Sequence, residues 1–177
     1  YLIKNKISSF DLKKRVGYLK NIIIREGHQT NEILINFITT SSDDSILSKL
    51  IELLIKKFKD IKSVINTIIK SNSGSSIGEE KILWGQDYIN ETIGEYSYKI
   101  SSNSFFQINT KQAEVLYDII IKICNFNGNE IVYDLYCGIG SIGIHIAKYV
   151  KMVYGVEVLM SAVINAIENA KNNNIKN

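Results

Sequence analysis

The sequence predicts an α/β protein in which a small α+β domain precedes the opening half of a doubly wound parallel sheet. Residues 131–133 form an apolar run that is typical of a buried strand, and residues 142–147 have the apolar spacing of a helix. The glycine-rich segment 134–141 joins the two, and a second apolar run follows at residues 152–156. Strand, glycine-rich turn, helix and strand in this order are typical of a nucleotide-binding α/β unit.

The glycine-rich segment has the spacing Asp-x-x-x-Gly-x-Gly, formed by Asp134, Gly138 and Gly140. Glycine has no Cβ atom, so the backbone of such a turn can come close to a nucleotide-like ligand. The second apolar run ends on Glu157, and an acidic residue at this strand tip can accept both hydroxyls of a ribose. Because the spacing differs from the Gly-x-Gly-x-x-Gly of NAD-binding folds, it favours S-adenosylmethionine as the ligand.

The remaining elements follow from apolar periodicity and from turn and cap residues. The amino-terminal part is predicted to hold a β-hairpin, a helix that begins at Asp43 or Asp44, and further strands. In order, the predicted elements are strands at residues 16–25 and 32–39, a helix to Lys59, a strand at 63–69, a Ser/Gly loop at 71–78, short strands at 82–85 and 96–100 with a turn between them, and helices at 109–124 and 161–171. In the last helix, Ala162, Ala166 and Ala170 suit close packing on a sheet.

A second segment, Asn-Ser-Phe-Phe-Gln-Ile-Asn at residues 103–109, stands just before the glycine motif. Together with Asp-Leu-Tyr-Cys-Gly-Ile-Gly at 134–140 and Val-Tyr-Gly-Val-Glu at 153–157, it resembles the RNA 5-methyluridine methyltransferase family. Members of that family methylate C5 of uridines in ribosomal and transfer RNA. Three earlier segments resemble the family's central domain, namely residues 23–27, 32–36 and 85–89. The resemblance extends from Val16 to Asn174.

The resemblance implies a central α+β domain at residues 1–102, expected to face RNA, and the first half of a Rossmann-like class I methyltransferase domain at residues 103–177. It implies that Gln107 contacts S-adenosylmethionine and that Glu157 holds its ribose. Tyr136 stands where relatives have Phe or Tyr, and Ser141 stands where they often have Asn. The predicted cofactor-binding residues are Gln107, Asp134, Tyr136, Gly138, Gly140, Ser141 and Glu157.

No catalytic residue is predicted within this chain. In the family, the nucleophilic cysteine, the carboxylate base and the aspartate that closes the cofactor site lie far downstream, and this sequence ends at Asn177 before any of them. The amino-terminal RNA-binding barrel and the iron–sulfur cysteines of many members are also missing, and the sequence begins at Tyr1. We therefore expect an internal fragment with a truncated class I methyltransferase domain, inactive by itself.

The two cysteines, Cys124 and Cys137, favour neither a disulfide scaffold nor a cysteine metal site. Cys137 lies beside the glycine turn, but the family keeps a cysteine there without using it in catalysis, so it is not expected to be the nucleophile. His145 is expected to pack in the motif helix and His28 to be solvated in a turn; no metal or iron–sulfur site is predicted.

Phe105 and Phe106 leave two readings open. One is packing in the core. The other is that one ring lines a pocket for a base that has left its stack, because enzymes that modify a base hold it outside the stack on aromatic side chains.

Composition limits the possible classes of protein. A chain of 177 residues with 45% hydrophobic residues is typical of a globular protein. There is no signal peptide pattern, and no apolar run approaches the roughly 20 residues that span a bilayer. Residues 1–100 hold 15 Lys/Arg and 12 Asp/Glu, whereas residues 101–177 hold six of each. This excess of three positive charges is too small to establish nucleic-acid binding. We expect an RNA partner, no membrane and a cytoplasmic location; the oligomeric state is open.

The expected function of the parent enzyme is transfer of a methyl group from S-adenosylmethionine to C5 of a uridine in ribosomal or transfer RNA. Uracil C5 becomes nucleophilic when a cysteine thiolate adds to C6, and it can then attack the methyl sulfonium. A base removes the C5 proton, and the cysteine is eliminated from C6. Two alternatives remain. One is a methyltransferase of another substrate class, since the fold alone does not determine the acceptor. The other is a non-catalytic RNA-binding fragment.

Overall fold

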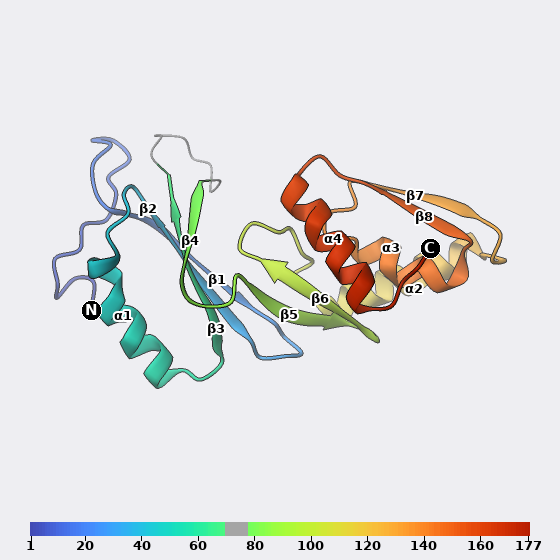
Figure 1. The fold of residues 1–177 in the computed structure, drawn as a ribbon, viewed down its shortest axis with the longest axis horizontal. Helices are drawn as coiled ribbons and strands as arrows, with labels where there is room; N and C mark the ends of the chain where they lie inside the picture. The colour runs from blue at the N-terminus through green and yellow to red at the C-terminus, as the bar shows by residue number, and fades with distance from the viewer. Residues whose placement is uncertain (70–77) are drawn as a thin grey trace. The chain divides into compact units, whose positions relative to one another are not determined.

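The computed structural model describes residues 1–69 and 78–177 (Figure 1). Contacts within the chain group these residues into two compact units. Residues 1–27 and 31–89 form the first unit, and residues 28–30 and 90–177 form the second. This grouping changes at about residue 90, before the predicted division at 102/103. The assignment of an RNA-facing domain and a cofactor domain to the two sides of residue 102 stays a prediction.

The first unit contains a four-stranded sheet whose strands follow the order β1-β2-β3-β4. Strands β1 and β2 form an antiparallel hairpin, β2 and β3 are parallel, and β3 and β4 are antiparallel. The helix α1 (Asp44–Lys57) is the crossover between the parallel pair, as a parallel connection requires. The strands are β1 (Leu19–Glu26), β2 (Ile33–Thr39), β3 (Ile61–Ile68) and β4 (Glu79–Gly85). The predicted hairpin, helix and third strand are confirmed.

Helix α1 begins where the sequence predicted it. The Asp43 side chain accepts a hydrogen bond from the backbone N–H of Ser45 at 3.1 Å, which satisfies one of the free N–H groups at the helix start. Leu47 and Ile51 of the helix belong to the buried core of this unit. The sheet supplies most of the other core side chains, among them Ile35, Phe37, Ile61 and Val64.

One sequence-based prediction for this region was wrong. Residues 86–95 were expected to be a turn between two short strands, whereas residues 88–93 form a further strand, β5 (Tyr88–Ile93), which pairs with β6 (Tyr96–Ser101). Strand β4 pairs with β3. Buried and partly exposed positions alternate along β5, but one of the buried positions is the charged Glu91. The sequence therefore does not show the alternation of apolar and polar residues that is typical of a strand. Most of the predicted Ser/Gly loop at 71–78 lies outside the described residues.

Glu91 is 2% exposed, and its carboxylate is matched by backbone donors. It accepts hydrogen bonds from the N–H groups of His28, of Gln29 at 3.1 Å and of Thr92 at 2.6 Å. The Thr30 hydroxyl donates to the Asn90 carbonyl at 2.6 Å. A buried carboxylate is tolerated only with such partners. These bonds therefore explain why residues 28–30 group with the second unit.

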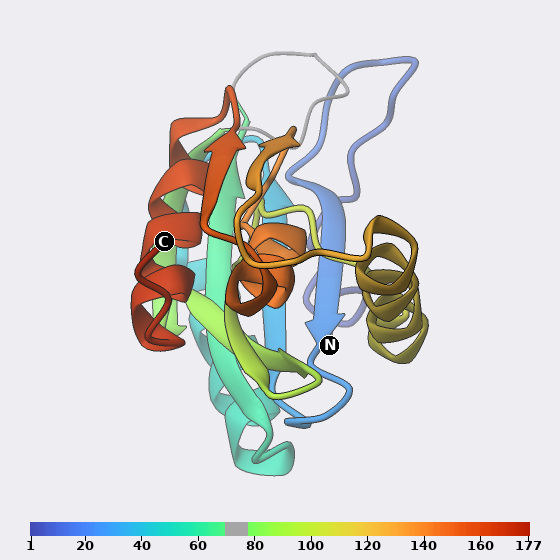
Figure 2. The ribbon, with the colours of Figure 1, turned by 90° about the vertical axis from the view of Figure 1, so that its right-hand side faces the viewer.

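The second unit follows the predicted strand, turn, helix and strand. Strands β7 (Ile131–Leu135) and β8 (Met152–Val156) are parallel neighbours, with Ile131 opposite Met152 and Leu135 opposite Val156. Helix α3 lies between α4 and α2 in the view of Figure 2. The helical elements are α2 (Thr110–Cys124), α3 (Ser141–Ile146), the 3₁₀ turn η1 (Ala147–Tyr149) and α4 (Met160–Asn172). Within the described part of the chain, no helix has the length and apolar character needed to cross a membrane.

The predicted cap of α2 is confirmed, since the Asn109 side chain accepts a hydrogen bond from the N–H of Gln112 at 3.0 Å.

The sheet formed by β7 and β8 has one face that is largely exposed. Tyr133 and Tyr154 stack across β7 and β8 with ring centroids 5.4 Å apart, on a face that the described residues leave largely open. The half-exposed side chains of this face are Ile131, Tyr133, Leu135, Tyr154 and Val156.

Replacing Leu47 by alanine tests the core of the first unit. Leu47 is fully buried, so Leu47→Ala is expected to lower the free energy of unfolding by about 2–5 kcal/mol. Leu53, on the same helix and 52% exposed, is the matched control, and Leu53→Ala should change the free energy of unfolding by less than about 0.5 kcal/mol. Urea unfolding followed by the fluorescence of Trp84 in β4, the only tryptophan, reports on this unit. Equal effects of the two substitutions would contradict the assigned core.

Candidate functional site

The turn between β7 and α3 has an unusual backbone. Tyr136, Gly138 and Gly140 have positive φ angles of 61°, 55° and 81°. Glycine adopts this left-handed region readily, but a tyrosine there is strained. The Tyr136 side chain is 89% exposed, so packing of its ring does not explain the strain. A strained, exposed aromatic residue in a turn of this kind is a candidate ligand contact.

Glu157 lies directly beside this turn. Its Oε2 accepts a hydrogen bond from the Gly138 N–H at 3.1 Å, and its Oε1 accepts from the N–H groups of Val158 at 2.7 Å and Leu159 at 2.9 Å. The bonds from Leu159, Val158 and Gly138, in that order, lower the pKa of Glu157. The carboxylate is therefore ionised at neutral pH and accepts hydrogen bonds only.

The Glu157 carboxylate has limited room for a ligand. A carboxylate offers roughly four lone-pair positions, and three of them are used by backbone N–H groups in this arrangement. The remaining position is on Oε2, which faces Gly138. Glu157 can thus accept one ligand hydroxyl as it stands. Accepting both hydroxyls of a ribose requires one backbone N–H to give up its bond.

Asp134 and Ser141 are engaged within the protein. Gly140 precedes α3 and has no side chain to cap the helix, and Oδ2 of Asp134 accepts from the Gly143 N–H at 3.0 Å in its place. Burial raises the pKa of Asp134. The Ser141 hydroxyl lies 3.0 Å from the Tyr117 hydroxyl, and its carbonyl accepts from the Tyr98 hydroxyl at 3.2 Å. Both residues therefore hold the turn in position.

Gln107 lines a different hollow from the one beside the glycine turn. It lines an open hollow of about 370 Å³ that also includes Asn109 and Gln112 and the apolar side chains of α2. Among the contacts of the residues that the structure describes, none joins Gln107 to the glycine turn. The convergence of Gln107 with Tyr136 and Glu157 on one crevice stays a prediction.

The two phenylalanines before Gln107 have different environments. The Phe106 ring is tilted against the Tyr98 ring, with centroids 5.8 Å apart. The Phe105 side chain is 75% exposed. Phe106 therefore contributes to packing, and Phe105 is the ring that is available to a ligand.

Cys137 points into the protein. It lines a hollow of about 250 Å³, together with residues of β7, β8, α3 and α4. Burial, and then the negative charges of Asp134 and Glu157, raise the pKa of Cys137. The thiolate is the nucleophilic form of cysteine, so this environment disfavours nucleophilic attack. Over the described ranges, no three His, Cys, Asp or Glu side chains lie close enough together to hold a metal ion.

His145 is a packed residue, as expected. Its ring is buried, with the rings of Tyr96 and Tyr117 against it at centroid distances of 5.5 and 5.3 Å. Its Nε2 lies 3.3 Å from Oδ1 of Asp118. Cys124 is exposed at the end of α2, on the helix rather than at the turn.

Sequence reasoning missed one polar feature near the turn. It emphasised the alanines of α4, but three asparagines of α4 and its C-cap, Asn165, Asn169 and Asn173, make polar contacts with other segments. Their spacing of four residues places them on one face of the helix. That repeat was the signal available in the sequence.

Substitution of Gly155 tests the inward position of Cys137. A Cβ atom at Gly155 would lie 2.9 Å from the Cys137 Sγ, which is too close. Gly155→Ala is therefore expected to lower the free energy of unfolding by about 1–3 kcal/mol. The cost should fall markedly in a Cys137→Ala background, as measured by a double-mutant cycle of thermal unfolding. Simple additivity of the two substitutions would contradict the contact.

Several known proteins resemble this chain in sequence. The sequence profile of the family described as tRNA (Uracil-5-)-methyltransferase matches residues 18–177. An uncharacterized RNA methyltransferase of Oceanobacillus iheyensis is 37% identical over 98% of this chain, and one of Streptococcus mutans is 40% identical over 97%. In both cases the match covers 38% of the relative. The chain thus spans less than half the length of these curated relatives.

Solved structures support the match to the tRNA (Uracil-5-)-methyltransferase family. The Pyrococcus abyssi tRNA (uracil-54, C5)-methyltransferase in complex with S-adenosyl-L-homocysteine is 30% identical and superposes with a TM-score of 0.83, over 99% of this chain and 42% of its own. A tRNA methyltransferase of M. jannaschii, 18% identical with a TM-score of 0.51 over 89% of this chain and 44% of its own, shares the fold alone. The predicted Rossmann-like methyltransferase fold is confirmed. The chain belongs to the tRNA (uracil-5-)-methyltransferase family.

Proposed function

We propose that the protein to which this chain belongs transfers a methyl group from S-adenosylmethionine to C5 of a uridine in RNA, and that this chain forms the first part of its cofactor site. The observation that carries the proposal is the hydrogen bond between Glu157 and the Gly138 N–H, which places an ionised carboxylate at the glycine turn. The name of the Pyrococcus abyssi relative, and its complex with S-adenosyl-L-homocysteine, support the reaction and the cofactor.

The residues of the turn fit the cofactor. A Cβ atom at Gly138 would meet nothing within 4 Å, so the backbone there faces open space that a ligand can enter. Glu157 retains one acceptor position for a ribose hydroxyl, and the exposed Tyr136 ring lies in the same turn. Asp134 and Ser141 act through the backbone that they hold, and the contact of Gln107 with the cofactor remains part of the proposal.

The chemistry divides between this chain and the rest of the enzyme. S-adenosylmethionine, when bound, supplies an electrophilic methyl group on sulfur. Uracil C5 would attack this methyl group only after a thiolate has added to C6, with S-adenosylhomocysteine as the leaving group. A base would then remove the C5 proton, and the thiolate would be expelled from C6. The raised pKa and inward position of Cys137 make it unsuited to that addition. The residues of this chain bind and orient, and the exposed Phe105 ring is our candidate for stacking on the extruded base.

The other candidate functions are less well supported. The family profile matches from residue 18, so the first unit belongs to the match as well as the glycine motif. This extent does not favour a methyltransferase of another substrate class. A non-catalytic RNA-binding fragment is distinguished by cofactor binding, which it would lack. The proposed substrate is ribosomal or transfer RNA. Because the proposed substrate is one of these RNAs, the proposed location is the cytoplasm.

Glu157→Ala tests the cofactor site. The substitution removes a charged acceptor, so the dissociation constant for S-adenosylhomocysteine, measured by calorimetry, is expected to rise about tenfold to hundredfold. The control is Glu130→Ala, because Glu130 also accepts backbone N–H bonds, from Asn127 and Gly128, but precedes the opposite end of β7. If Glu157→Ala and Glu130→Ala leave the same affinity as the unsubstituted chain, Glu157 does not bind the cofactor.

The isolated chain is expected to be catalytically inactive. It should yield no 5-methyluridine when incubated with uridine-containing RNA and methyl-labelled S-adenosylmethionine, because Cys137 is the only cysteine at the turn and its environment disfavours the thiolate. Labelled 5-methyluridine at stoichiometric amounts or above, and its loss in Cys137→Ala, would refute both the division of the chemistry and the structural role of Cys137.

A further inference from the structure

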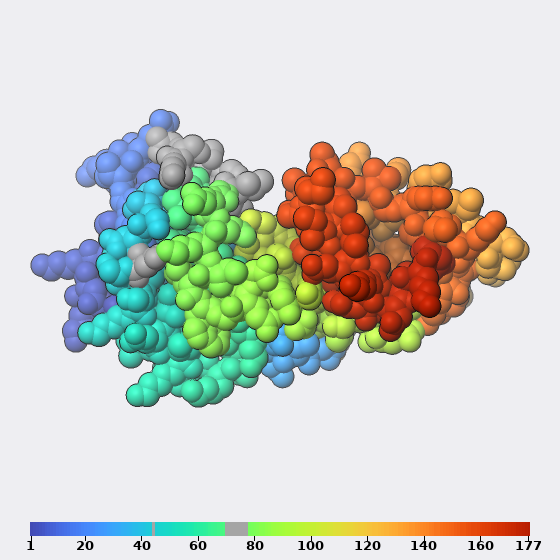
Figure 3. Space-filling view, in the orientation of Figure 1, coloured from blue at the N-terminus to red at the C-terminus, as the bar shows by residue number. Residues whose placement is uncertain are grey.

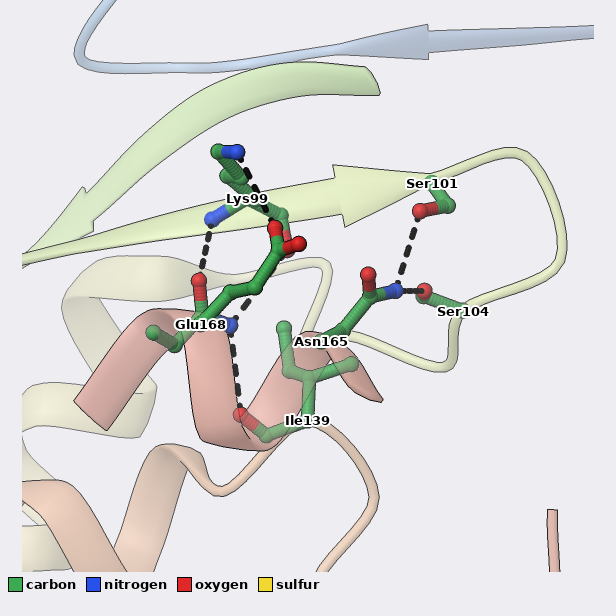
Figure 4. A network of polar contacts seen from close by, with 7 residues as sticks. Lys99, Ser101, Ser104, Ile139, Asn165 and Glu168 are labelled. Carbon is green, nitrogen blue, oxygen red and sulfur yellow. Dashed lines mark hydrogen bonds and ion pairs between the residues drawn. The ribbon is translucent and has the colours of Figure 1, made fainter. Parts of the chain in front are cut away.

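Two asparagines of α4 and the asparagine at its C-cap form hydrogen bonds with β6. Asn165, Asn169 and Asn173 are four residues apart, so they form one row along the helix. The opposite side of α4 lies at the surface, where Ile164 and Ile167 are half-exposed or more (Figure 3). Figure 4 shows the network around Asn165, Glu168 and Lys99, in which side chains of α4 reach β6 and the segment that follows it.

Two of these amides pair with the edge of β6 as a neighbouring strand would. Oδ1 of Asn173 accepts from the Ser97 N–H at 2.9 Å, and its Nδ2 donates to the Ser97 carbonyl at 2.6 Å. Asn169 does the same at Lys99, at 2.8 Å and 3.5 Å. Four residues of helix rise about 6.0 Å and two residues of strand about 6.7 Å, so the two repeats stay in step over this length.

Asn165 continues the row to the last residue of β6 and the segment that follows it. Its Nδ2 donates to the hydroxyls of Ser101 at 2.9 Å and Ser104 at 2.8 Å (Figure 4). Ser104 is buried and immediately precedes Phe105. Asn109 fixes the far end of this segment by capping α2. The segment that carries Phe105, Phe106 and Gln107 is therefore held at both ends.

Asn169 has a further partner in the glycine turn. Its side chain is fully buried, and Nδ2 also donates to the Ile139 carbonyl at 3.2 Å. Ile139 stands between Gly138 and Gly140. One amide thus joins the β6 backbone to the turn that faces the proposed cofactor. A helix that merely packed on β6 would need no bond to Ile139 or to Ser104.

We propose that Asn165 and Asn169 are positioning residues of the methyltransferase site. Asn169 sets the place of the glycine turn relative to β6, and Asn165 sets the start of the segment that bears Phe105 and Gln107. This inference rests on the proposed function, since it assigns those two segments to the cofactor and base. Neither asparagine touches the ligand; each acts through the backbone or the hydroxyls that it holds.

The partners of the two asparagines predict opposite responses to aspartate. The partners of Asn165 are hydroxyls, which can rotate and donate to a carboxylate, so Asn165→Asp should preserve the anchor. The Nδ2 partners of Asn169 are carbonyls, which only accept, so Asn169→Asp leaves them without a donor. Asn165→Leu, of similar size, removes the anchor at Ser104. Asn172→Asp adds the same charge at an exposed position of α4 and is the control.

The experiment measures backbone amide exchange and S-adenosylhomocysteine affinity in the 177-residue chain and these four variants. Asn165→Leu should speed exchange at residues 102–108 and weaken the affinity about fivefold to tenfold, the scale of one or two lost hydrogen bonds. Asn165→Asp should restore both towards the unsubstituted values. Asn169→Asp should speed exchange at residues 138–140 and weaken binding at least as much, and Asn172→Asp should change neither.

The outcomes separate this inference from the proposed function. An unsubstituted chain that shows no binding refutes cofactor binding by the chain, and the inference then fails with it, whatever the exchange pattern. Binding that Asn165→Leu leaves unchanged, or that Asn165→Asp weakens as much as Asn165→Leu, overturns the inference while the proposed function stands. If Asn169→Asp does not fold, the comparison of Asn165→Leu with Asn165→Asp decides alone.

Discussion

The second unit depends on one buried side-chain amide, that of Asn169. The backbone N–H and C=O groups at a strand edge need hydrogen-bond partners when the edge is covered. The edge of β6 is covered by a helix, whose own backbone groups are already bonded to one another. Asn169 and Asn173 supply those partners from their side chains, and Asn169 extends the same pairing to the carbonyl of Ile139. Helix, hairpin and glycine turn are thereby connected by hydrogen bonds as well as by packing.

The two parallel strands of this unit use acidic residues in a similar way. Asp134, near the end of β7, accepts from the first turn of α3, and Glu157, just after β8, accepts from the two residues before α4. Negative charge at a helix amino terminus is favourable, because the free N–H groups there carry partial positive charge. The role of Asp134 is structural, whereas Glu157 also accepts a hydrogen bond from Gly138 and keeps an acceptor position for a ligand.

The sequence was informative where structure is local. The caps at Asp43 and Asn109, the hairpin β1–β2 and the parallel pair β7–β8 follow from spacing and cap residues, and all are confirmed. It was uninformative where a polar group is buried by distant partners. Glu91 hid the alternation of β5, since its donors include His28 and Gln29, more than sixty residues earlier. The asparagines of α4 were overlooked for the same reason, because their partners lie on β6 and in the turn.

The pairing of a helix with a strand edge constrains how this sequence can change in length. One residue inserted in α4 between Asn165 and Asn173 would rotate all later positions by about 100° around the helix axis. One residue inserted in β6 would turn the groups of Ser97 or Lys99 to the other side of the strand. Either insertion would separate the asparagine side chains from the β6 backbone groups with which they pair. Insertions and deletions should therefore be confined to connecting segments among descendants of this gene, while β6 and α4 diverge by substitution alone.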